Sequence, residues 1–188
     1  MKRILFPVLA AGASLLALSA HAANDGGEIK FEGELTAQTC AVDVDGITTQ
    51  PALVKLPTVS TSLLSAPGST TANRLFNINL KNCTEQSGTA RAFFEYEAGV
   101  VDFADGTLMN TLAPATGVAT KVALQLKDGV SNAVIVAGSG TQLTTNTART
   151  VDATGNATLP YSVQYISQLG GATAGKIESR VTYSIAYN

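Results

Sequence analysis

The feature that most restricts the fold is a strict alternation of polar and apolar residues over positions 28–36. Ile29, Phe31, Gly33 and Leu35 share one side of this segment, and charged residues occupy most of the other side. A period of two is that of a β-strand, whose successive side chains point to opposite faces. The segment is therefore predicted to be a strand with one apolar face.

Further short segments of strand character follow along the chain, punctuated by Gly, Pro, Asn and Asp. They are residues 52–56, 76–80, 92–97, 122–126, 133–136, 157–166 and 176–187. Residues 58–73 are rich in Ser, Thr, Ala and Pro and are expected to form a loop or a short helical turn. The chain lacks Trp and is poor in charge, which suits pleated strands better than helices. Several short strands with turns between them predict an all-β sandwich.

The N-terminus has the three parts of an export signal. A basic start at Lys2 and Arg3 is followed by an uncharged run over residues 4–19 and by the small-x-small site Ala20-His21-Ala22. The run is short of the roughly 20 apolar residues that a membrane anchor needs, and no second such run follows. Residues 1–22 are therefore predicted to be a signal peptide, and the mature chain is expected to lack a membrane span.

Cleavage after Ala22 would leave 188 − 22 = 166 residues, enough for one domain. It removes Lys2 and Arg3, so that 10 basic residues face 14 acidic ones, a net charge of −4. Scattered charges of this sign offer no basic surface for a nucleic acid. Cleavage also removes His21, the only histidine.

Cys40 and Cys83 are the only cysteines. In an oxidising compartment such a pair is predicted to form a disulfide. The alternative of a redox or metal pair is weaker, because neither CxxC spacing nor other soft ligands are present.

Other candidates for chemistry are better explained as surface features. Glu95 and Glu97 would lie about 7 Å apart on one strand face, where a solvated surface explains them better than a glycosidase pair. Residues 43–46 and 102–106 resemble fragments of calcium loops but lack the remaining oxygen ligands. The sequence therefore predicts a protein that is not an enzyme, with no catalytic residues, metal site or cofactor.

The two ends of the mature chain and the cysteine segments together resemble the major pilins of chaperone-usher, type 1-like fimbriae. Residues 25–33 look like the donor strand of this family, and residues 39–43 and 76–83 look like the segments that carry its disulfide. Residues 159–165 are similar to its late strand. The donor residues implied by the resemblance are Gly27, Ile29, Phe31 and Gly33.

The C-terminus also resembles the chaperone-recognition pattern of these pilins. Tyr187 is penultimate, and Gly175 is fourteenth from the end, since 188 − 175 + 1 = 14. Between these two positions, the odd-numbered residues from 177 to 187 are apolar except for Ser179. The residues implied for the edge that meets a chaperone or a donor strand are Gly175, Ile177, Val181, Tyr183, Ile185 and Tyr187.

The resemblance implies an incomplete immunoglobulin-like β-sandwich that a strand from a neighbouring subunit completes. Residues 23–36 would be the donor-strand extension and residues 37–188 the pilin domain. The expected function is that of a structural subunit of an adhesive surface fimbria, exported through the periplasm and polymerised by donor-strand exchange. The expected partners are other pilin subunits, a periplasmic chaperone and an outer-membrane usher. Two alternatives stay open: a minor adaptor pilin of the same fibre, and a freestanding secreted carbohydrate-binding β-sandwich.

Overall fold

The computed structural model of the chain describes residues 29–33, 40–84 and 88–188. Thr36–Asn188 form one compact unit, in which nearly all regular structure is β. The helical elements of the described residues are the 3-10 turn η1 (Thr61–Leu64) and the one-turn helix α1 (Gln142–Thr145). The strands are β1 (Ala41–Val44), β2 (Ser69–Lys81), β3 (Thr89–Phe94), β4 (Leu108–Met109), β5 (Ala123–Asp128), β6 (Val134–Ile135), β7 (Arg149–Thr150), β8 (Ala157–Ser167) and β9 (Tyr183–Tyr187).

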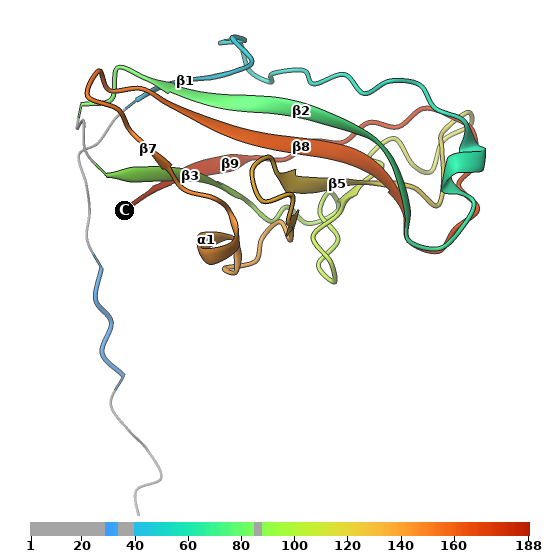
Figure 1. Ribbon diagram of the computed structural model, residues 1–188. Coiled ribbons are helices and arrows are strands. Elements are labelled where there is room, and N and C mark those ends of the chain that lie inside the picture. Colours follow the sequence, from blue (N-terminus) through green and yellow to red (C-terminus); the bar gives the residue numbers. More distant parts are fainter. Residues whose placement is uncertain (1–28, 34–39, 85–87) are drawn as a thin grey trace, which may run out of the picture. The chain divides into compact units, whose positions relative to one another are not determined.

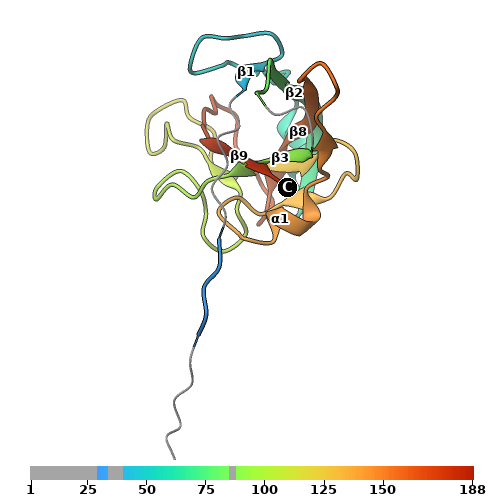
Figure 2. The same cartoon turned by 90° about the vertical axis from the view of Figure 1, so that its left-hand side faces the viewer.

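The described strands form two antiparallel sheets. The larger has the order β1-β2-β8-β5-β4, with β6 also paired to β5. The smaller has the order β7-β3-β9. Figures 1 and 2 show them as two layers, with β2 and β8 in one and β3 and β9 in the other. Since neighbours in each sheet come from distant parts of the chain, the architecture is that of a sandwich and not of a simple meander.

The core lies between the two layers and follows the strand alternation. Phe76, Ile78 and Leu80 of β2 are buried, and so are Leu159, Tyr161 and Val163 of β8. The ring of Phe94 in the smaller sheet meets the ring of Tyr161 edge to face, with centroids 5.0 Å apart. The two sheets therefore share one apolar core.

The predicted strands agree with the structure best where they have partners. Residues 76–80 and 157–166 lie within β2 and β8, which pair along most of their length. Residues 52–56 were predicted as a strand but belong to none, and only Tyr183–Tyr187 of the segment 176–187 forms one. Alternating polar and apolar side chains indicate that a segment can adopt an extended conformation. A β-strand also needs a neighbouring segment to which its backbone can hydrogen-bond.

The expected loop over residues 58–73 is partly structured. It contains η1 at Thr61–Leu64, as a short helical turn was predicted, but β2 begins at Ser69 inside it. The Ser- and Thr-rich start of β2 pairs with the end of β8, with a register shift between Thr71 and Arg74. Composition alone pointed to a loop here, and the pairing with β8 overrides it.

Residues 29–33 belong to a separate unit, Met1–Leu35, and none of them is in a strand. Ile29 and Phe31 are 75% and 88% exposed, and Lys30 pairs with Glu32. Gly27 and the predicted signal peptide lie outside the described residues. Among the described residues, no helix has the length and hydrophobicity to cross a membrane.

Candidate functional site: the open edge of the smaller sheet

Strand β9 lies at one edge of the smaller sheet, because it pairs with β3 and with no other strand of the described residues. Thr89 and Asn188 exchange both backbone hydrogen bonds, at 2.8 and 2.9 Å. Residues of an antiparallel strand turn their backbone groups alternately to either side. The backbone of Tyr183 and Ile185 therefore faces away from β3. An edge of this kind can pair with a further strand.

The side chains of β9 divide into an apolar row and a polar row. Val181, Tyr183, Ile185 and Tyr187 are half-buried and pack against the core. On the other side, Ser184 donates its hydroxyl to Glu95 Oε1 at 2.7 Å. The apolar row is thus in contact with the core and still partly open to solvent.

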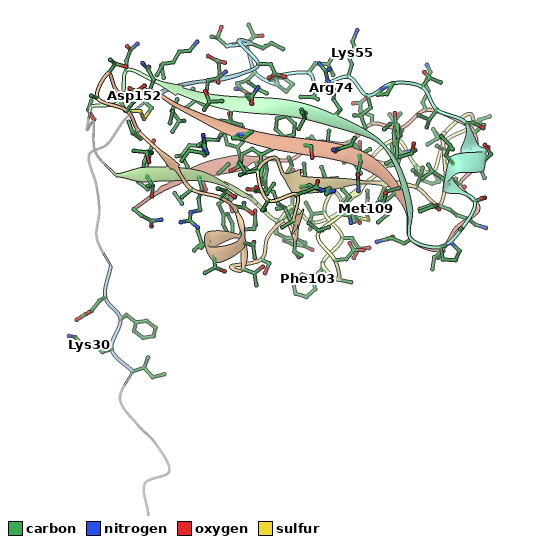
Figure 3. The ribbon with its side chains drawn as sticks, viewed as in Figure 1. Lys30, Lys55, Arg74, Phe103, Met109 and Asp152 are labelled. Carbon is green, nitrogen blue, oxygen red and sulfur yellow. A yellow bond between two sulfur atoms is a disulfide. The ribbon has the colours of Figure 1, made fainter. Side chains whose placement is uncertain are left out.

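Residues 51–57 provide a second half-exposed apolar row. Ala52, Val54 and Leu56 pack against the core, and the residues between them are exposed. Figure 3 shows Lys55, one of the latter, pointing away from the sheets. We call the two rows together the open edge: Ala52, Val54 and Leu56 on one side, and Val181, Tyr183, Ile185 and Tyr187 on the other.

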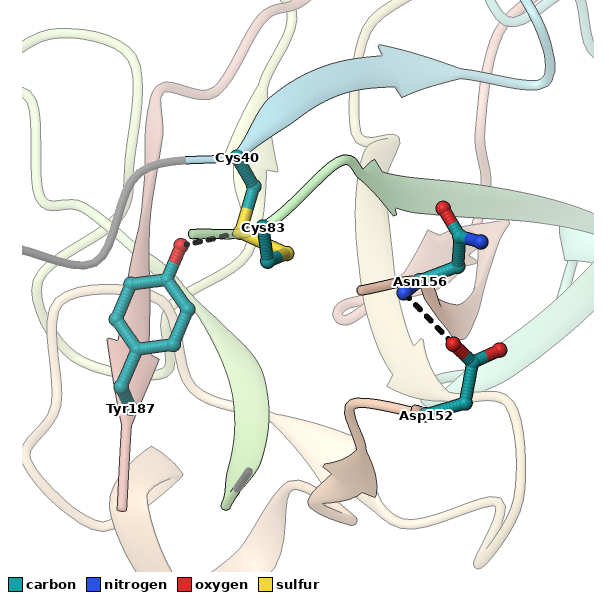
Figure 4. The surroundings of a disulfide bond; sticks show 5 residues. All are labelled: Cys40, Cys83, Asp152, Asn156 and Tyr187. Atoms are coloured by element: carbon teal, nitrogen blue, oxygen red, sulfur yellow. Dashed lines mark hydrogen bonds between the residues drawn. A yellow bond between two sulfur atoms is a disulfide. The ribbon is translucent and has the colours of Figure 1, made fainter. Parts of the chain in front are cut away.

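The chain segments that carry the two sides of the open edge, residues 40–57 and 175–187, meet at the end that holds the disulfide. Cys40 and Cys83 are joined as predicted, and Cys40 Sγ lies 3.3 Å from the Tyr187 hydroxyl (Figure 4). The disulfide ties the start of β1 to the end of β2, beside the last residues of β9. It therefore holds the start of the first segment beside the end of the second.

The two sides meet again at the other end, around a pocket of about 430 Å³. Thr58 and Val59 line it together with Gly175, Ile177 and Glu178. Between the two ends, no β-pairing joins residues 41–57 to β9 in the described part of the chain. The two chain segments are thus held next to each other at both ends, but they have no backbone pairing with each other in between.

Gly175 lies where the backbone of two segments almost touches. A Cβ atom at this position would lie 2.4 Å from the backbone nitrogen of Ala119, and φ is +153°. Lys176 completes the contact by donating to Gly117 O at 3.0 Å and accepting from Ala119 N at 2.9 Å. A side chain at position 175 would separate these segments.

The surroundings of the two tyrosines in the open edge favour their uncharged form. Burial raises the pKa of the Tyr187 phenol. Burial, and then the negative charge of Asp43, raise that of Tyr183. Both phenols therefore stay neutral at physiological pH. Ser179 Oγ is buried in the same row and has no hydrogen-bond partner among the described residues.

The structure brings together the residues that the sequence assigned to the C-terminal edge. Ile177, Val181, Tyr183, Ile185 and Tyr187 all pack against the same core as half-exposed side chains. The sequence reasoning did not assign the facing residues 52–56 to this site, although their alternation was visible. The sequence reasoning assigned the pocket residues Gly175 and Ile177 to the C-terminal edge, but not Thr58 and Val59, which a distant part of the chain brings to the same pocket.

The described residues contain no group of three or more His, Cys, Asp or Glu side chains that could hold a metal ion. The carboxylates considered above serve the surface or the local backbone. Glu97 pairs with Arg180, and Asp102 accepts from Ala104 N at 2.8 Å. The chemistry that this site offers is strand pairing and apolar contact.

Comparison with known proteins agrees with this geometry. Residues 56–188 match the family model of type-1 fimbrial protein, A. The chain is 36% identical over 174 residues to the major fimbrial subunit SMF-1 of Stenotrophomonas maltophilia, covering 91% of this chain and 96% of that protein. It is 37% identical over 186 residues to the F17 fimbrial protein of Escherichia coli, covering 96% and 94%.

A solved chaperone-usher pilus structure shares the fold. Its TM-score is 0.55 at 18% identity, covering 88% of this chain and 97% of that one. The fold is accordingly the incomplete immunoglobulin-like sandwich of such subunits, and the family and fold are those of structural pilins, which are not enzymes. The chain belongs to the type-1 fimbrial protein family and is a structural pilin subunit of a surface fimbria.

Proposed function

We propose that this pilin polymerises by strand addition, in which the N-terminal segment of one subunit fills the open edge of the next. The donor residues are Gly27, Ile29, Phe31 and Gly33. The observation that carries the proposal is the pair of half-exposed apolar rows that converge at both ends without pairing in between. An added strand satisfies backbone groups and covers apolar surface in one step.

The donor and the acceptor match in length and period. Residues 27–33 and residues 181–187 are both seven residues long, which corresponds to about 23 Å of strand. Each has four positions on one face of the strand. Glycine at two of the donor positions leaves Ile29 and Phe31 as the large groups to be buried, and both are exposed in the single chain.

The favourable free energy of strand addition comes mainly from covering the apolar surface of the acceptor, and not from burying the donor side chains. Burying Ile29 and Phe31 contributes about 1.5–3 kcal/mol each, while ordering the segment costs about 1–2 kcal/mol per residue. The free energy gained by burying the two donor side chains is therefore smaller than the cost of ordering the donor segment. The net gain comes from removing Val181, Tyr183, Ile185 and their facing residues from water.

The proposed assembly is directional. Donor and acceptor surfaces differ, so the contact is heterologous and propagates as an open filament. Before assembly, a periplasmic chaperone occupies the edge that ends at Tyr187, and an outer-membrane usher accepts the subunit for export. In this scheme residues 1–22 are removed, residues 23–36 are the donor extension and residues 37–188 are the pilin domain.

The test compares the chain beginning at Ala23 with one beginning at Leu35, both produced in a periplasm that supplies a fimbrial chaperone and usher. Filaments and SDS-resistant ladders are expected only for the longer chain, since the shorter one lacks the donor. The variant Phe31→Asp in the longer chain is expected to lose them as well, because it places a charge against the apolar row.

Lys30→Asp is the matched control, because it changes charge on the opposite side of the same donor segment. It is expected to polymerise like the parent chain. Filaments from the chain beginning at Leu35, or equal loss in Lys30→Asp and Phe31→Asp, would refute donation by this face.

A further inference from the structure

The smaller sheet has a second edge, on the side of β3 that faces away from β9. Thr89 bonds to Asn188, the residue that follows β9, so the backbone of Ala90, Ala92 and Phe94 faces the other way. Strand β7 covers the beginning of this side, where Ala90 pairs with Arg149. We call the backbone groups of Ala92 and Phe94, beyond the end of β7, the second edge.

Side chains bond to all four backbone groups of the second edge, and the backbone N–H of Gly138 also donates to Phe94 O, at 2.8 Å. Ala92 N donates to the Tyr161 hydroxyl at 2.8 Å, and Asn146 Nδ2 donates to Ala92 O at 3.0 Å. Phe94 N donates to Gln142 Oε1 at 2.9 Å, and Gln142 Nε2 donates to Phe94 O at 2.9 Å. The Gln142 amide thus makes the two bonds that a residue of a neighbouring strand would make.

The amide side chains that bond to the second edge are buried, and the segment that carries them is held in place. Gln142 and Asn146 are 0% and 2% exposed. Thr147, next to Asn146, donates its N–H to Asp128 Oδ2 at 2.7 Å and its hydroxyl to Asp128 Oδ1 at 3.0 Å. Asp128 belongs to β5 of the larger sheet. The segment that carries the two amides is therefore fastened to the opposite layer.

We propose that Gln142 and Asn146 close the second edge to incoming strands and so restrict each subunit to one acceptor site. The inference rests on the proposed strand addition at β9. Unpaired edge groups recruit strands from other chains, and a linear fibre needs one acceptor per subunit. A second accessible edge on the same sheet would allow branching.

The test counts donor strands bound per subunit. The chain beginning at Ala23 is refolded with excess synthetic peptide of residues 25–36, and native mass spectrometry measures the complexes. The parent chain is expected to bind one peptide. The double variant Gln142→Ala/Asn146→Ala is expected to bind two, a twofold rise, and to give branched filaments by electron microscopy.

Gln164→Ala is the matched control. Gln164 is also a buried glutamine, but it bonds to Gln125 at 2.8 Å on the larger sheet. It is expected to keep one peptide. If the double variant does not refold, Gln142→Met retains the side-chain volume, loses both bonds to Phe94 and is expected to show complexes with two peptides.

The outcomes separate this inference from the proposed function. A parent chain that binds no peptide contradicts strand addition itself. A parent chain that binds one peptide, with Gln142→Met or the refolded double variant also binding only one, overturns the closing role of the second edge. Two peptides on the Gln164→Ala control would overturn it as well, because any lost buried amide would then suffice.

Discussion

At the scale of single residues, Gly175 shows how a sequence position can be restricted by backbone contact alone. Its place fourteenth from the C-terminus belongs to the proposed recognition pattern, but the structure supplies a packing reason. The backbone of residues 117–119 lies against it, with no room for a Cβ atom. Any role in recognising a partner acts in addition to this restriction.

Gly175→Ala is expected to destabilise the subunit by more than about 1 kcal/mol, because the added atom meets backbone and not a movable side chain. Thermal unfolding of the peptide-completed subunit measures the loss. Gly140→Ala is the control, since nothing lies within 4 Å of a Cβ atom there. Equal melting temperatures for the two variants would contradict the close-contact argument.

Asp43 is a buried carboxylate at the disulfide end. A hydrogen bond from Asn79, and then the interaction with Lys81, lower its pKa from 3.8 to about 2. Asn79 Nδ2 and Lys81 Nζ each lie 2.7 Å from a carboxylate oxygen. Since its folded pKa is depressed, Asp43 stabilises the fold above its unfolded pKa, and this contribution is lost as the pH falls toward about 2.

Asp43→Asn is therefore expected to lower the melting temperature at neutral pH and to flatten its decline between about pH 4 and pH 2. The measurement is thermal unfolding of the peptide-completed subunit across this range. Asp45→Asn, in the same turn but exposed, serves as the control. Parallel declines for the parent chain and Asp43→Asn would show that Asp43 does not contribute to the acid sensitivity.

At the scale of elements, the disulfide holds the start of β1 beside the end of β2. The closed loop contains 83 − 40 + 1 = 44 residues, and it includes residues 51–57 of the open edge. That segment has no strand partner in the described residues, so its position depends on anchors at its ends. Before the segment, the chain is held by the pairing of β1 with β2, which the disulfide fastens at Cys40. At its other end, the Tyr165 hydroxyl donates to Pro57 O at 3.2 Å.

Cys40→Ser/Cys83→Ser is expected to destabilise the subunit by roughly 4 kcal/mol, from the chain entropy of the opened loop. Because the loop carries one side of the open edge, peptide binding is expected to weaken in addition. Denaturation with and without the peptide of residues 25–36 separates the two effects. A stability loss with unchanged peptide affinity would mean that β1 positions residues 51–57 without the disulfide.

At the scale of the whole molecule, the subunit has one sheet edge open and another closed by side chains. The proposed strand addition at β9 would link folding to assembly, because the added strand would complete the core. Anything that binds the folded state alone raises stability with its concentration.

The subunit beginning at Leu35 is accordingly expected to melt at a higher temperature as the peptide of residues 25–36 is added. At 100 times the dissociation constant the gain is about 2.7 kcal/mol. The same peptide with Phe31→Asp is the control and is expected to give little or no shift. A melting temperature independent of the parent peptide would contradict an open acceptor edge.

The sequence by itself determined the elements whose signal is local. Alternation identified residues 76–80 of β2, where every second residue is buried, and strand-forming residue types identified residues 157–166 of β8. The two cysteines identified their own disulfide, and the C-terminal alternation identified the half-exposed apolar residues on one side of the open edge. The donor residues Gly27, Ile29, Phe31 and Gly33 remain a prediction from the sequence.

Only the tertiary structure decided which alternating segments became strands. Residues 52–56 and 176–182 carry the pattern but have no continuous strand partner in the described chain. The two-residue strands β4 and β7, in contrast, have partners although the sequence predicted no strand there. The side-chain amides of Gln142 and Asn146 bond to β3, which lies about 50 residues earlier in the sequence. The physical reason is that a strand is defined by hydrogen bonds to a distant segment, and side-chain periodicity reports only which face will be buried.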